Sequence, residues 1–112
     1  MNKVKRLYVR EFHFVCRDRR GVKRLSAEHF ITGLWAVSQR RCEEAARLGA
    51  LVALHQSKAS PSYVQGKIIS WKVVLDPETQ RDRIQFTVQK TSKSLRWGGN
   101  GSGEKGYVWS SE

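Results

Sequence analysis

The chain has 112 residues, of which 39% are hydrophobic and 10% aromatic, and this composition excludes a largely disordered polypeptide. Its 21 Lys and Arg outnumber its 10 Asp and Glu, which gives a net charge of +11 at pH 7. No apolar run could span a membrane, and no apolar segment follows the basic first residues. We therefore expect one cytoplasmic domain over residues 1–112, without a signal peptide, that meets a polyanionic partner.

The first third of the chain begins with a predicted strand. Residues 7–16 are rich in aromatic and β-branched types, which favour a strand. Its alternation places four side chains on one face: Tyr8, Phe12, Phe14 and Cys16. The charged stretch 17–21 predicts a turn, and residues 26–29 predict a short helical turn.

The pattern then changes to a strand followed by the only clear helix. Residues 31–37, which include Trp35, predict a second strand. Ser38 is a suitable N-cap for a helix over residues 39–48, and Gly49 suits the position just after its end. Four residues form the apolar side of this helix: Cys42, Ala45, Ala46 and Leu48.

The rest of the chain predicts strands joined by polar turns. The expected strands cover residues 50–56, 63–75, 83–90 and 107–109, with loops at 57–62, 76–82 and 91–106. In the long strand Gly66 predicts a bulge, and Ile69, Trp71, Val73 and Leu75 are expected to share one face. The predicted fold class is α+β, a small curved mixed or antiparallel β-barrel with one main helix.

Glycines, cations and aromatic rings alternate between Arg96 and Trp109. Flat rings beside positive charge suit a polyanion that carries aromatic bases, which describes nucleic acid. Residues 101–106 match G-x-G-x-x-G, but no helix follows, so the dinucleotide-binding interpretation is rejected. A flexible surface loop remains the alternative to a phosphate-binding loop.

Three stretches of the chain carry a resemblance to a known superfamily: residues 34–37, 42–55 and 63–69. Their order, a strand with Trp, a helix, Gly, a strand, a polar loop and a strand with an internal Gly, resembles the PUA-like superfamily, nearest to its EVE branch. The resemblance covers residues 31–75. It implies a curved barrel whose cleft binds RNA or DNA and can enclose a modified or flipped base. It places Trp35 and Ser38 near the cleft, and Ser57 and Lys58 on the ligand side.

We predict that the partner is RNA or DNA, held by cations on phosphates and by rings on bases. Four rings are candidates for stacking, and they are Trp35, Tyr63, Trp97 and Trp109. Ser38 and Ser57 are candidates for hydrogen bonds to a base edge. Lys58, Arg96 and Lys105 are candidates for phosphate contacts. The oligomeric state is left open.

The sequence predicts no metal, no cofactor and no catalytic residues. His13, His29 and His55 lack metal-ligand spacing and are interpreted as ordinary polar or half-buried residues, and Cys16 and Cys42 as small buried hydrophobes. Two alternatives stay open. One is a hydrolase of modified nucleobases or nucleosides that uses Lys58, Thr32 and Glu104. The other is a module that binds an acidic protein through its basic surface.

Overall fold

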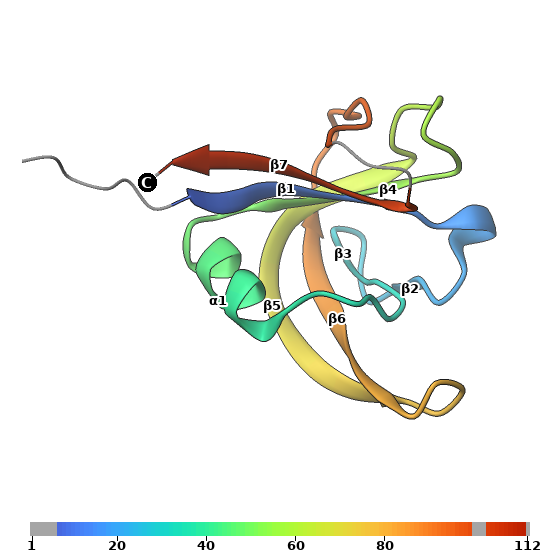
Figure 1. The fold of residues 1–112 in the computed structure, drawn as a ribbon. Helices are drawn as coiled ribbons and strands as arrows, with labels where there is room; N and C mark the ends of the chain where they lie inside the picture. Colours follow the sequence, from blue (N-terminus) through green and yellow to red (C-terminus); the bar gives the residue numbers. More distant parts are fainter. Residues whose placement is uncertain (1–6, 100–102, 112) are drawn as a thin grey trace, which may run out of the picture.

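A computed structural model describes residues 7–99 and 103–111 and shows an α+β fold built on one mixed sheet. Seven strands form this sheet in the order β2-β3-β6-β5-β4-β1-β7 (Figure 1). The strands are β1 (Leu7–Val15), β2 (Lys23–Arg24), β3 (His29–Ile31), β4 (Leu51–His55), β5 (Val64–Asp76), β6 (Arg81–Lys90) and β7 (Lys105–Ser111). The sheet curls but is open, because its end strands β2 and β7 each have one hydrogen-bonded neighbour. The α+β prediction is confirmed at this level, while a closed barrel is not seen.

Strand β1 is the predicted first strand and lies between β4, which runs parallel to it, and β7, which runs antiparallel. Its pairing with β7 is irregular between Val9 and Glu11. This bulge shifts the alternation, so Val9 is buried in the core with Phe12 and Phe14. The prediction that Tyr8 shares their face was wrong, because the extra residue in the bulge moves each residue before it to the opposite face of the strand.

The segment after β1 differs from the prediction in two places. Residues 26–29 do not form a helical turn, because the Ser26 hydroxyl accepts hydrogen bonds from the backbone amides of Glu28 and His29 and closes a tight turn between β2 and β3. The prediction of a strand over residues 31–37 was also wrong for most of its length, since β3 spans His29–Ile31. Beyond Ile31, the Thr32 amide donates to the Phe86 carbonyl and Trp35 forms a single bridge to Ile84, both on β6.

Helix α1 (Gln39–Arg47) begins and ends as predicted to within one residue. The Ser38 side chain accepts a hydrogen bond from the Arg41 amide, and Gly49 has a φ of +74°, a conformation that glycine adopts without steric cost. Cys42 and Ala45 are buried where the helix packs on β1 and β5 (Figure 1). Burial raises the pKa of the Cys42 thiol to about 12, so this cysteine is an inert core residue, as predicted.

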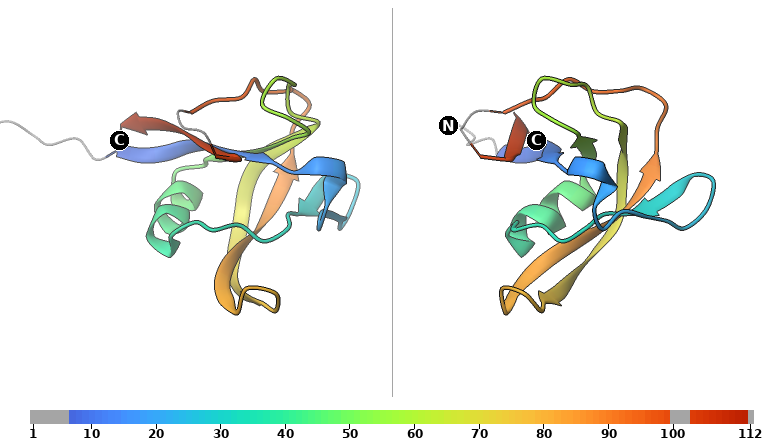
Figure 2. Two further views of the ribbon diagram at one scale, coloured as in Figure 1. Left: turned by 45° about the vertical axis from the view of Figure 1, so that its right-hand side comes forward. Right: turned by 90° about the vertical axis from the view of Figure 1, so that its right-hand side faces the viewer.

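Strands β5 and β6 form a long hairpin that extends away from β1 and β7 (Figure 2). The bulge in β5 falls between Ile68 and Ser70, so Ile69 is 48% exposed and the prediction of a bulge at Gly66 was wrong. Gly66 serves a different purpose, because a Cβ there would lie 1.9 Å from the carbonyl oxygen of Gln89 on β6. A glycine in a strand can mark close backbone approach as well as a bulge.

The core lies inside the curl of the sheet and is rich in stacked aromatic rings. Phe14 stacks on Trp35 at 4.2 Å between ring centroids, and Phe12 lies 5.4 Å from Phe86 and 5.3 Å from Tyr107. Strand β7 is longer than the predicted 107–109 and brings Tyr107 to this core. Within the described residues, α1 falls short of the length and apolar character needed to cross a bilayer.

Candidate functional site

Two loops from distant parts of the sequence meet next to the C-terminal end of strand β4. Ser62 joins them, since its amide donates to the Leu95 carbonyl at 2.8 Å and its hydroxyl accepts from the Leu95 amide at 2.8 Å. Between the loops lies an open hollow of 440 Å³, the Trp97 hollow. It is lined by Lys58, Ala59, Ser60, Pro61, Arg96 and Trp97.

The Trp97 hollow combines an aromatic face with positive charge. The Lys58 ammonium lies 5.5 Å from the centre of the Trp97 ring, and Arg96 is exposed beside it. A cation within about 6 Å of an indole is attracted by the negative face of the ring. Ser57 lies at the rim, where its hydroxyl is 3.2 Å from that of Ser60. The structure thus brings together four predicted residues from two loops: Ser57, Lys58, Arg96 and Trp97.

Glycines hold the Trp97 segment against strand β7. A Cβ on Gly106 would lie 2.2 Å from the Gly98 carbonyl oxygen, and a Cβ on Gly98 would lie 2.3 Å from Cγ2 of Val108. Gly99 has a φ of +108°, which other residues rarely adopt. These glycines therefore allow close approach of two backbones. Residues 101 and 102 of the predicted glycine loop lie outside the described residues, and Gly103 is exposed with open space around it.

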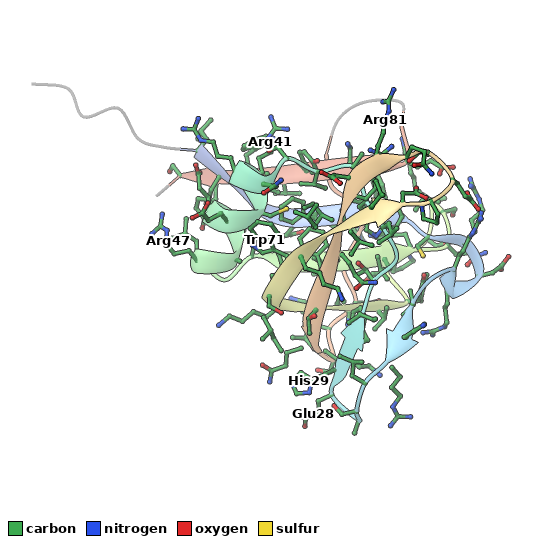
Figure 3. The ribbon with its side chains drawn as sticks, turned by 90° about the horizontal axis from the view of Figure 1, so that it is seen from below. Glu28, His29, Arg41, Arg47, Trp71 and Arg81 are labelled. Atoms are coloured by element: carbon green, nitrogen blue, oxygen red, sulfur yellow. The ribbon has the colours of Figure 1, made fainter. Side chains whose placement is uncertain are left out.

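A second hollow, of 420 Å³, contains two other predicted residues, Ser38 and Trp109. Trp109 is 43% exposed, and the Arg41 guanidinium lies 5.3 Å from its ring centre and 5.5 Å from that of Tyr107. Figure 3 shows Arg41 and Arg47 on α1 and Arg81 on the β5–β6 hairpin. The Ser38 hydroxyl already accepts a hydrogen bond from the Arg41 amide.

The remaining predicted residues lie elsewhere. Trp35 borders a hollow of 690 Å³, and its indole Nε1 is buried without a hydrogen-bond partner. Tyr63 donates its hydroxyl hydrogen to the Cys16 carbonyl at 2.6 Å, and Lys105 donates to the Ala36 carbonyl at 2.6 Å. The three tryptophans among the predicted residues therefore line three different hollows rather than one groove.

A chain of polar groups, with two buried histidines at its centre, lies directly beneath Trp97. His13 Nδ1 is 2.8 Å from His55 Nε2, His13 Nε2 is 2.9 Å from Glu11 Oε1, and His55 Nδ1 is 2.8 Å from the Ser60 carbonyl oxygen. We call Glu11, His13, His55 and the Ser60 carbonyl the histidine chain. The Trp97 ring centre lies 5.7 Å from that of His13 and 5.1 Å from that of His55.

Sequence reasoning missed the histidine chain. His13 and His55 were interpreted as ordinary polar or half-buried residues, but both are 0% exposed. The available signal was that each follows an apolar residue within an apolar strand, Phe12 before His13 and Leu54 before His55. Burial lowers the pKa of His55, the hydrogen bond to the Ser60 carbonyl raises it, and the charge of His13 lowers it.

The described residues offer no assembled hydrolytic centre from the residues considered. Thr32 is buried, donating its hydroxyl hydrogen to the Gly33 carbonyl and accepting from the Phe86 amide, while Glu104 pairs with Arg17 at 2.6 Å. Lys58 lies at a different hollow from Glu104. The histidine chain ends on a backbone carbonyl rather than on a nucleophile, so it does not form a catalytic triad.

Among residues 7–99 and 103–111, no three His, Cys, Asp or Glu side chains lie close enough together to hold a metal ion. No family model, curated protein or solved structure matches the chain.

Proposed function

We propose that this domain binds nucleic acid, RNA or DNA, with a base stacked on Trp97 and phosphates held by Lys58 and Arg96. The observation that carries the proposal is the Trp97 hollow, where an indole, an ammonium 5.5 Å from its centre and an exposed guanidinium meet. Stacking of a base on such a ring contributes roughly 1–3 kcal/mol and tolerates many sequences.

The overall charge supports the same partner. The chain carries 21 Lys and Arg against 10 Asp and Glu, a net charge of +11 at pH 7. An excess of this size attracts polyanions over a distance set by the ionic strength. Because cations on phosphates release bound counterions, we expect affinity to fall steeply with salt.

The shape of the hollow favours an unpaired strand. It is formed by two loops and is open, so it suits a base whose face is free rather than one stacked within a duplex. The PUA-like resemblance stays a prediction, and with it the curved barrel and the recognition of a modified or flipped base. If a base is flipped, the 690 Å³ hollow beside Trp35 offers a space for it.

The proposal is tested by titrating labelled single-stranded and double-stranded RNA and DNA while recording backbone amide and Trp indole signals. We expect single strands to shift the Trp97 indole and the amides of residues 57–60. The Lys58→Ala/Arg96→Ala variant should lower the slope of log affinity against log salt by about 1.4, because two phosphate contacts on a single strand are lost.

The matched control removes the same charge at exposed positions on the β5–β6 hairpin, as Lys72→Ala/Arg81→Ala. We expect this variant to bind with nearly the slope of the unmodified protein. Equal losses in the two variants would argue for diffuse charge attraction without a site. Absence of binding by all four polymers would refute the proposal, and a pull-down that resists nuclease would then favour an acidic protein partner.

A further inference from the structure

The histidine chain contains three hydrogen bonds, whereas two neutral imidazoles have only two N–H groups to donate. It has three contacts: Glu11 to His13, His13 to His55, and His55 to the Ser60 carbonyl. The carbonyl at one end only accepts, so His55 Nδ1 donates to it. His55 Nε2 then accepts from His13 Nδ1 if His55 is neutral. This leaves His13 Nε2 facing a carboxylate, which also accepts.

Three hydrogen bonds between two terminal acceptors need three protons, whereas two neutral imidazoles carry two. The third proton lies between His13 Nε2 and Glu11 Oε1. The Arg10 guanidinium is 3.5 Å from the other carboxylate oxygen of Glu11. The Glu11 carboxylate accepts at this contact, so both nitrogens of His13 donate and His55 Nε2 accepts.

The charged groups that face the chain oppose one another in their effect on this proton. They are Arg10 and Glu11 on β1, Lys58 in the loop after β4 and Arg96 in the covering segment. Glu11 stabilises the extra proton, and the cations disfavour it. Lys105 is directed to the Ala36 carbonyl. Among the described residues, Glu11 is the acid whose carboxylate contacts His13, and it accepts the hydrogen bond of the third proton.

The residues that cover the chain rest directly on it. The Trp97 ring lies against both imidazoles, and a Cβ on Gly98 would lie only 3.2 Å from His13 Nε2. Losing the third proton would leave two acceptors facing each other at 2.9 Å, and adding a fourth would leave two N–H groups facing each other at 2.8 Å. Either change breaks a buried hydrogen bond beneath Trp97.

We propose that the histidine chain is a one-proton latch, which holds residues 95–99 closed over β1 while it carries three protons and releases them when it carries two or four. The latch is a property of the folded chain and does not depend on which ligand occupies the Trp97 hollow. It makes the position of the Trp97 ring depend on pH.

The test uses Glu11→Gln, because a glutamine amide can donate to His13 Nε2 and so completes the chain with two neutral imidazoles. In the unmodified protein we expect the Trp97 indole signal to shift as pH rises through the loss of the third proton. The protection factor of the Leu95 amide, which donates to Ser62, should fall about tenfold at the same pH. Glu11→Gln should show neither change on the alkaline side.

Glu44→Gln is the control, since it also removes a carboxylate that contacts an arginine, Arg40, but on α1. It should keep the alkaline transition. An alkaline transition that is unchanged in Glu11→Gln, or absent from the unmodified protein, would overturn the latch.

A second measurement needs no variant. Spectra of the protein labelled with ¹⁵N in its three histidines should show three imidazole N–H groups shared by His13 and His55 at neutral pH, with His29 as the reference signal. Two such groups would overturn the proton count, even if Glu11→Gln failed to fold.

Discussion

Strand β1 has two faces, and the molecule covers both, one with the apolar core and the other with residues 95–99. On the first face Phe12 and Phe14 are fully buried among other rings. On the second, His13 is equally buried but is held by hydrogen bonds to Glu11 and His55. Burial alone therefore does not say what stabilises a face. Packing is indifferent to pH, whereas a hydrogen-bonded face depends on its protons and on its cover.

The largest effect is expected on the apolar face. Phe14→Ala should reduce the free energy of unfolding by about 3–5 kcal/mol, because it leaves a cavity between Trp35 and Phe86. Urea unfolding measures the loss. Leu75→Ala, at a position that is 56% exposed, should change the free energy by less than about 0.5 kcal/mol. Comparable losses in the two variants would contradict the placement of the core.

A smaller effect is expected from moving the cover on the polar face. Gly98→Ala should lower the free energy of unfolding by about 1–3 kcal/mol, because its Cβ would meet Val108 at 2.3 Å and push residues 97–99 away from His13. Thermal unfolding and the Trp97 indole signal report the change. Gly103→Ala is the matched control, since nothing lies within 4 Å of a Cβ there. Equal tolerance of both changes would show that the cover is not in close contact.

The smallest effect, and the one that separates the faces most clearly, is expected on acidification. Burial lowers the pKa of His55 in the fold below its ordinary value of about 6.5, so the unfolded chain takes up this proton more readily. The contribution of His55 to the free energy of unfolding is therefore complete above about pH 6.5, and it is lost as pH falls toward the pKa of His55 in the folded protein. Urea midpoints between about pH 7 and about pH 5.5 measure the slope, in a range mostly above carboxylate titration.

Two variants show which histidine causes this acid slope. His55→Gln should flatten it, and His29→Gln should leave it in place, because the His29 ring lies at the β2–β3 turn, with Nδ1 2.9 Å from the Ser26 hydroxyl. The apolar face of β1 should not contribute to the pH dependence of the urea midpoint. A slope that survives His55→Gln would assign the effect to the carboxylates instead.

Local sequence signals predicted the elements whose stabilising contacts are also local. Ser38 and Gly49 marked the ends of α1, and alternation marked most of β1 and β6. The errors occur where a side chain or a bulge competes with the pattern. The Ser26 hydroxyl closed a turn where a helical turn was expected, and the bulges near Arg10 and Ile69 shifted the faces of their strands.

The candidate site was predictable in composition but not in arrangement. The sequence pointed to Lys58, Arg96 and Trp97 as separate candidates, and nothing in the pattern said that Ser62 would join their two loops. It equally gave no reason to separate Trp35 and Trp109 from Trp97. Such groupings depend on contacts between residues more than 30 positions apart, which periodicity does not encode.

The amino-acid sequence by itself determined the charge of the chain, the helix with its caps, and strands of apolar alternation, because these depend on composition and on neighbours along the chain. Only the tertiary structure decided that His13 and His55 are buried and bonded to each other. That outcome needs β1 and β4 to pair in parallel and the Trp97 segment to cover them, and both are contacts between distant parts of the chain.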